Sequence, residues 1–215
     1  YRNQIMHLFV SEAIIACSVN NYVQRGISPS RKDLLTSAQF LSRLLKWEFV
    51  YEAPFEETFT ATLDKMVKDG TLCEQNGHVL CSKDQNGARL FSFLCFLLWP
   101  FVEGYWMAAQ YLSTLLPDRA LEEKLFMNEI QMSGEILYYQ GDLQFFESLS
   151  KEVIRSALER FMERGILAKQ MINDKGMMII KPSEAVKANP AKLEKTVHKI
   201  NQFRKFNPYT GKAKL

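Results

Sequence analysis

The chain has 215 residues, 47% hydrophobic and 12% aromatic, which is enough for one large domain or two small ones with a sizeable core. Its net charge of +3 is too small to indicate nucleic-acid binding. The charge is unevenly placed: from Lys181 onward there are nine lysines and arginines and two acids, so the tail carries +7 and the remainder −4. We expect a solvated basic arm, with contact to anionic lipid or a receptor as the alternative.

In the first half of the chain, apolar residues recur with helical period in three segments. Ser30 is suited to cap the second helix and Gly70 to end the third. Asn76-Gly77 is typical of a two-residue hairpin turn. The expected elements are three helices and a hairpin, over residues 3–23, 32–50, 57–70 and 71–82.

The hairpin register predicts the state of two of the four cysteines. A turn at Asn76-Gly77 pairs Cys73 with Leu80 and Cys81 with Leu72, so the two thiols point to opposite faces and should not bridge. There is no CxxC pair, and the three histidines are far apart in sequence. We therefore expect no metal site, no cofactor and a reducing compartment. The N-terminal stretch does not have the form of a signal peptide.

A long helix is predicted over residues 85–115, with a kink at Pro100. Its most apolar run, Leu90 to Val102, would extend about 20 Å as a helix, short of the roughly 30 Å hydrocarbon layer of a membrane. We interpret it as a buried core helix, with a helix lying in a membrane interface as the alternative.

The second half is predicted to continue with a helix that starts after Pro117 and another that Ser150 caps. A second hairpin is expected around Asp174-Lys175-Gly176, followed by a last helix over residues 189–206.

An internal repeat with a constant offset of 95 residues joins the two halves. Each copy is an amphipathic helix, a glycine and a hairpin, as in the back half of a winged-helix unit. The helices carry mixed charge rather than a basic stripe, so we expect packing modules and no nucleic-acid partner. The matched pairs are Leu63 and Leu158, Met66 and Phe161, Gly70 and Gly165, and Leu72 and Leu167.

The sequence thus predicts a mainly α fold: a helical bundle with two small β-hairpins, in which two winged-helix-like units are joined by the long apolar helix. The expected divisions are an N-terminal helical and winged-helix-like unit over 1–84, the apolar helix with the second such unit over 85–182, and a basic tail over 183–215.

Residues that could carry chemistry are few. His7 and Glu12 have almost the His-x-x-x-x-Asp spacing of glycerolipid acyltransferases, but on a helix they would lie some 140° apart. No nucleotide-binding, serine-hydrolase or zinc-protease motif is present. Glu103 sits in an apolar helix and needs a partner, an arginine or tyrosine at a helix seam. We predict no catalytic residue, and a possible interface at His7, Trp99, Phe101, Glu103, Tyr105 and Trp106.

Three stretches resemble one enzyme family. They are "YRNQIMHLFVSEAII", "FLSRLLKWEFVY" and "FLLWPFVEGYWMAAQYL", the last containing a "PFVE-x-Y" core. They are similar to segments that follow the catalytic domain in the bacterial, mitochondrial and peroxisomal glycerol-phosphate/dihydroxyacetone-phosphate acyltransferases. The resemblance covers most of residues 1–165. The family's catalytic blocks lie upstream of such segments, so it implies a non-catalytic C-terminal region whose parent enzyme transfers a fatty acyl group from acyl-CoA in glycerolipid synthesis.

Ala213-Lys214-Leu215 has the form of a peroxisomal import address. With the resemblance, it favours the dihydroxyacetone-phosphate branch, which begins ether-lipid synthesis. The expected partners are the catalytic domain of the same protein and an import receptor, with a membrane surface as a further candidate. Two alternatives stay open: the same region of a glycerol-3-phosphate sn-1 acyltransferase of the mitochondrial outer membrane or of bacterial type, and a free-standing helical adaptor.

Overall fold

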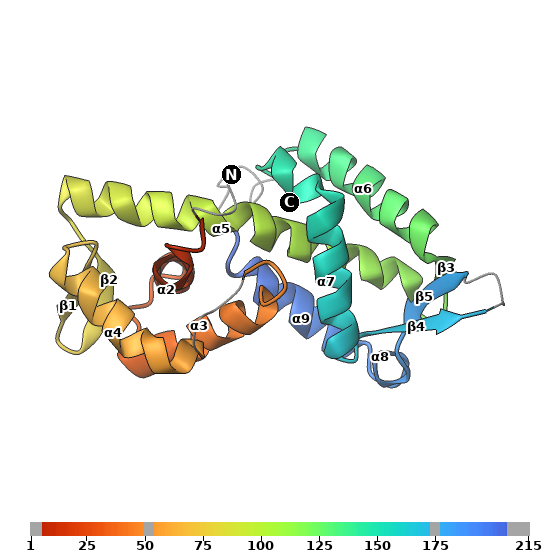
Figure 1. Cartoon of the computed structure of the whole chain (residues 1–215), viewed down its shortest axis with the longest axis horizontal. Coiled ribbons are helices and arrows are strands. Elements are labelled where there is room, and N and C mark those ends of the chain that lie inside the picture. Colours follow the sequence, from red (N-terminus) through yellow and green to blue (C-terminus); the bar gives the residue numbers. More distant parts are fainter. Residues whose placement is uncertain (1–5, 50–53, 173–176, 206–215) are drawn as a thin grey trace. The chain divides into compact units, whose positions relative to one another are not determined.

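The computed structural model describes residues 6–49, 54–172 and 177–205. Within them the chain forms eight α-helices and two small antiparallel sheets, which confirms the mainly α fold with small hairpins (Figure 1). By internal contacts it separates into two units, Tyr1–Trp99 and Pro100–Leu215. This division falls inside the long helix, whereas the expected boundary was at residue 84.

The first unit is built around α2, where residues 13–17 have no exposed surface. Ser30 caps α3 as predicted: its hydroxyl accepts from the Asp33 backbone N–H at 3.2 Å, and the Asp33 carboxylate accepts from the Ser30 N–H at 3.1 Å. The elements of this unit are α2 (Val10–Val23), α3 (Arg31–Leu44), α4 (Phe55–Lys68), β1 (Leu72–Gln75), β2 (His78–Cys81) and the start of α5 (Gln85–Leu112).

The first hairpin has the predicted turn and register. Asn76 and Gly77 both have positive φ, 53° and 76°, as a tight hairpin turn of this type requires. Cys73 lies opposite Leu80 and Leu72 opposite Cys81. Cys73 and Cys81 are free, as this register predicts, and Cys17 and Cys95 are free as well.

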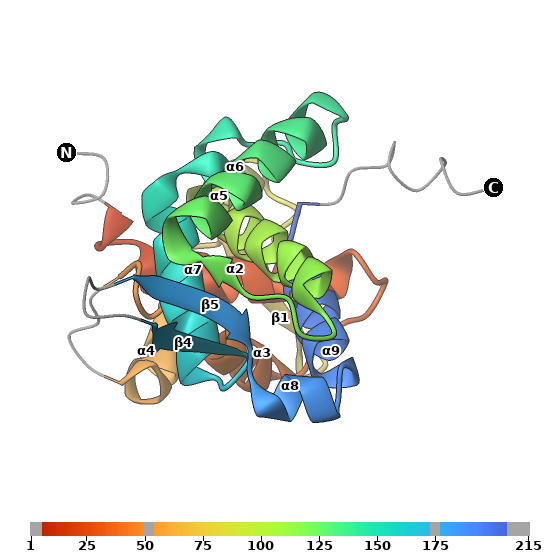
Figure 2. The same ribbon diagram turned by 90° about the vertical axis from the view of Figure 1, so that its right-hand side faces the viewer.

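The second unit contains the rest of α5 and a three-stranded sheet of order β3-β5-β4 (Figure 2). Its fully buried aromatic residues are Tyr105, Phe126, Phe161 and Phe203. Its other elements are β3 (Leu121–Glu122), α6 (Glu123–Tyr139), the 3-10 turn η2 (Phe146–Leu149), α7 (Lys151–Glu163), β4 (Leu167–Met171), β5 (Met178–Pro182), α8 (Glu184–Ala188) and α9 (Ala191–Asn201).

The repeated residues occupy matching places. Leu63 and Leu158 are buried on α4 and α7. Gly70 and Gly165 follow these helices with φ of +73° and +62°, a conformation that favours glycine. Each glycine precedes the first strand of a hairpin. The repeat in the sequence is therefore also a repeat of local structure.

Several segments differ from expectation. The helix expected directly after Pro117 begins at Glu123, because Leu121–Glu122 pairs with β5. Residues 183–205 of the expected basic arm form α8, α9 and a short turn, and they bury Leu193, Ile200 and Phe203. The turn expected at 174–176 lies outside the described residues.

Within the part of the chain that the structure describes, one helix, Gln85–Leu115, has the length and apolar composition needed to cross a membrane. Of its most apolar window, 61% is buried. A core helix gives the same pattern, so this burial supports our interpretation of the apolar run.

Candidate functional site

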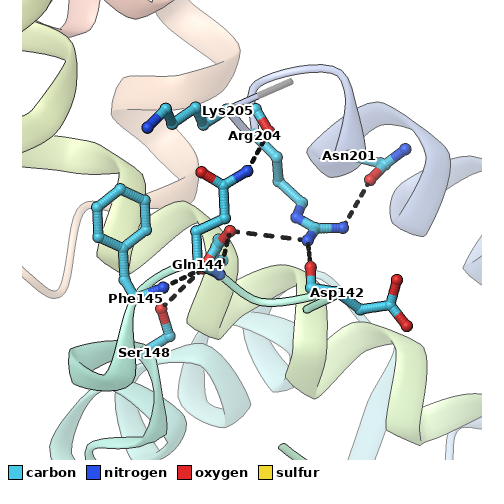
Figure 3. A network of polar contacts seen from close by, with 8 residues as sticks. Asp142, Gln144, Phe145, Ser148, Asn201, Arg204 and Lys205 are labelled. Carbon is cyan, nitrogen blue, oxygen red and sulfur yellow. Dashed lines mark hydrogen bonds and ion pairs between the residues drawn. The ribbon is translucent and has the colours of Figure 1, made fainter. Parts of the chain in front are cut away.

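Glu103 is the centre of a buried polar network in the second unit. It lies on α5 and has no exposed surface. Its carboxylate accepts hydrogen bonds from the backbone N–H of Gln144 at 3.0 Å and of Phe145 at 3.1 Å, and from the Ser148 hydroxyl at 3.4 Å (Figure 3). The segment before α7 thus donates three hydrogen bonds to Glu103, the acid within the apolar helix α5.

Arg204, three residues after α9, supplies the charge partner. Its guanidinium lies 3.7 Å from the Glu103 carboxylate and 3.6 Å from the centre of the Trp106 ring. It also donates to the Asp142 carbonyl oxygen and, at 3.1 Å, to the Asn201 side-chain oxygen (Figure 3). One arginine therefore ties the end of the described chain to α5 and to the loop before α7.

Burial controls the protonation of this pair. Desolvation raises the pKa of Glu103, and the opposing effects of Arg204, the two backbone N–H groups and Ser148 are smaller. Desolvation likewise lowers the pKa of Arg204 against the attraction of Glu103 and Asp142. Both directions are those of a buried ion pair whose desolvation penalty is incompletely compensated.

Close packing surrounds the network. A Cβ added at Gly104 would lie 2.6 Å from Val153 Cγ1 and 2.9 Å from the Ser148 carbonyl oxygen. α5 therefore meets the start of α7 across a glycine. Among the described residues, the Glu103 carboxylate has no exposed surface, and its hydrogen bonds join α5 to the segment before α7.

The other predicted interface residues have different environments. Trp99 is 6% exposed and Tyr105 is fully buried, so both are core residues within the described chain. Phe101 and Trp106 are half-buried, and His7 is exposed with its ring edge-on to Phe49 at 6.1 Å.

Glu12, which has almost the catalytic spacing from His7, forms an ion pair with a different residue. The Glu12 carboxylate binds the Lys65 ammonium of α4 at 2.9 Å. It therefore serves to join α2 to α4. Among the described residues, no three His, Cys, Asp or Glu side chains gather as a metal site requires. Ala213, Lys214 and Leu215 lie outside the described residues.

Sequence reasoning found Glu103 but not Arg204. The signal for Glu103 was an acid inside an apolar run, which requires a partner. Arg204 is the one arginine among the nine cations from Lys181 onward, but the sequence does not show which cation reaches Glu103. Its distance of 101 positions from Glu103 leaves no local pattern to detect.

Comparison with known proteins agrees with the resemblance. Residues 1–170 match the family model of the glycerol-3-phosphate acyltransferase C-terminal region. The chain is 25% identical over 180 residues to the dihydroxyacetone phosphate acyltransferase of Bos taurus, and 26% identical over 180 residues to that of Homo sapiens. Each alignment covers 81% of this chain and 25% of the relative, so the chain spans about a quarter of the length of these relatives. The chain belongs to the glycerol-3-phosphate acyltransferase C-terminal region family.

Proposed function

We propose that this chain is the non-catalytic C-terminal region of an acyltransferase that transfers a fatty acyl group from acyl-CoA to dihydroxyacetone phosphate. The family match over residues 1–170, with relatives named dihydroxyacetone phosphate acyltransferase, carries the proposal. The buried environment of Glu103 supports the non-catalytic role. Glycerol 3-phosphate is the second candidate acceptor, because the family description names it.

We further propose that the first unit packs on the acyltransferase part of the same protein through an exposed apolar surface. Phe93 and Phe96 on α5 are 47% and 44% exposed, and Leu90 is 41% exposed. Phe9 meets Phe93 edge-on at 6.1 Å, and Leu8 next to it is 74% exposed. We call this surface, Leu8, Leu90, Phe93 and Phe96, the Phe93 face. Apolar exposure of this kind marks contact sites.

The Phe93 face can be tested by producing the chain and the acyltransferase part as separate polypeptides in one cell. We expect the two to co-purify, and acyl transfer to require the acyltransferase part. The Phe93→Ser/Phe96→Ser variant should lose co-purification by about tenfold or more, because it removes two exposed aromatic side chains that the contact would bury. Met171→Ser, at a residue 62% exposed on β4, is the matched control.

Turnover by the 215 residues alone would overturn the non-catalytic role. If the Phe93→Ser/Phe96→Ser variant still co-purified, the Phe93 face would not be the contact with the acyltransferase part. Binding of the chain to lipid vesicles that the same change abolishes would favour a membrane surface instead.

We also propose that Ala213-Lys214-Leu215 directs the protein to peroxisomes. A labelled peptide of residues 207–215 is expected to bind the cargo domain of a peroxisomal import receptor, with binding lost when Leu215 is removed. Fluorescence polarisation measures both. Equal weak binding of the two peptides would instead favour the glycerol-3-phosphate branch and leave the family assignment unchanged.

A further inference from the structure

The four cysteines of the chain are far apart in the sequence, but all of them lie in the first unit. Cys17 on α2 and Cys95 on α5 have no exposed surface. Cys73 on β1 and Cys81 on β2 are half-buried. We call Cys17 and Cys95 the core pair, and Cys73 and Cys81 the hairpin pair.

The two thiols of the core pair are in contact. The Cys17 thiol donates to the backbone carbonyl oxygen of Cys95 at 3.8 Å, and the two thiols hydrogen-bond to each other. The hydrogen bond with Cys17, together with burial, raises the pKa of Cys95 well above its ordinary value, so Cys95 is a neutral thiol at neutral pH. Because 78 positions separate Cys17 from Cys95, only the fold brings them together.

The two cysteines of the hairpin pair are also close in space, but they are oriented differently. Cys73 lies opposite Leu80 and Cys81 opposite Leu72, so the two side chains project from opposite faces of the hairpin. The Cys73 thiol donates to the backbone carbonyl oxygen of Cys81 at 3.7 Å. Side chains that point apart cannot form a disulfide unless the backbone moves. The hairpin pair is therefore an internal control for the core pair.

We propose that Cys17 and Cys95 are a redox-responsive pair, which a peroxide converts to a disulfide that ties α2 to α5. The peroxide oxidises one thiol to a sulfenic acid and is itself reduced to water. The second thiol then attacks the oxidised sulfur, the S–S bond forms, and a second water leaves. With hydrogen peroxide, two thiols and one peroxide thus give one disulfide and two waters. A small dithiol reverses the reaction and is itself oxidised. The proposal does not depend on the proposed acyltransferase function.

Burial decides when the core pair reacts. Peroxide reaches the two sulfurs only when the unit opens locally, and Cys95 is not a thiolate at rest. Both properties keep the pair reduced during a brief exposure to peroxide. Once one sulfur is oxidised, its contact with the second favours the disulfide over further oxidation. We therefore expect a response to sustained oxidant, with the thiols reduced in a reducing compartment.

Peptide mapping after trypsin digestion distinguishes the possible bonds. Cys17, the hairpin pair and Cys95 lie in three different tryptic peptides, residues 3–25, 69–83 and 90–119. The full chain is oxidised with hydrogen peroxide under native conditions at low protein concentration, alkylated and digested. We expect peptides 3–25 and 90–119 to be joined at least about tenfold more often than the hairpin pair is bridged. Dithiothreitol should separate the joined peptides.

The same oxidation in guanidinium chloride shows what the unfolded chain does. Without the fold, the shorter loop closes more readily, so the bond between Cys73 and Cys81 should exceed the bond between Cys17 and Cys95 by roughly tenfold or more. The preferred pair should therefore reverse between the native and the unfolded chain.

Two variants complete the test. Cys95→Ala should abolish the joined peptides, and Cys73→Ala should leave their yield unchanged. Circular dichroism checks that each variant is folded, and the peptide map of the unmodified chain decides the question if Cys95→Ala does not fold. The proposal would be overturned if Cys17 and Cys95 stayed reduced while peroxide oxidised Cys73 and Cys81 in the folded chain. A native bond between peptides 69–83 and 90–119, or the same map for the native and the unfolded chain, would contradict it equally.

Discussion

The Arg204→Met variant is expected to unfold with a free energy about 3–5 kcal/mol lower than that of the unmodified chain. The methionine fills much of the same space, but Glu103 is left without its charge partner at a site with no exposed surface. The link to the Asp142 carbonyl and the contact with the Trp106 ring are lost as well. Chemical denaturation followed by circular dichroism and tryptophan fluorescence measures the change.

The loss should depend on pH. Burial raises the pKa of folded Glu103 above its ordinary value of 4.5, and Arg204 partly counteracts this. The unfolded chain releases this proton first, so the contribution of Glu103 to stability falls as pH rises through its folded pKa. Removing Arg204 raises the folded pKa of Glu103 further, so the pH range over which Glu103 lowers stability becomes wider. The loss in Arg204→Met should therefore be larger at about pH 8 than at about pH 5.

Two further variants separate the ion pair from general packing. Arg204→Met combined with Glu103→Gln should recover part of the loss, because no buried charge is left unpaired. Arg43→Met breaks the exposed pair of Arg43 and Glu56 and should change stability little. A loss independent of pH, or a double variant as unstable as the sum of the single ones, would contradict a buried ion pair.

Local signals predicted the fold best. The Ser30 cap, the Asn76-Gly77 turn and the glycines that end α4 and α7 each act within a few residues. Their chemistry is therefore readable from a short window of sequence. The constant offset of the repeat then predicted the second copy from the first.

Non-local pairings limited the rest. β3 consists of only Leu121 and Glu122, and it is a strand because these residues pair with β5. Two residues are too few to show a strand pattern in the sequence. α9 was predicted as a helix, but the sequence did not predict that Leu193 and Ile200 would be buried in the second unit. The Glu103 network is similar: the sequence showed that a partner was needed, and only the fold identifies Arg204.

The Phe161→Ala variant should lose about 3–5 kcal/mol of unfolding free energy. Phe161 is the α7 counterpart of Met66 in the repeat and has no exposed surface. Its ring meets Tyr105 of α5 at 6.2 Å between centres. Alanine removes this contact and leaves a cavity that the packed neighbours cannot fill by relaxing. Denaturant midpoints at unchanged slope measure the loss.

A cycle with Tyr105→Leu isolates the ring contact within that loss. The coupling between the two positions should be about 0.5–1.5 kcal/mol, the range for paired aromatic rings beyond their burial. Phe161→Leu should cost less than Phe161→Ala because it leaves a smaller cavity. Met171→Ala, at an exposed position on β4, should cost little. If Phe161→Ala were no more harmful than Met171→Ala, α7 would not be part of the core. The repeat would then match the sequence of α4 without matching its packing role.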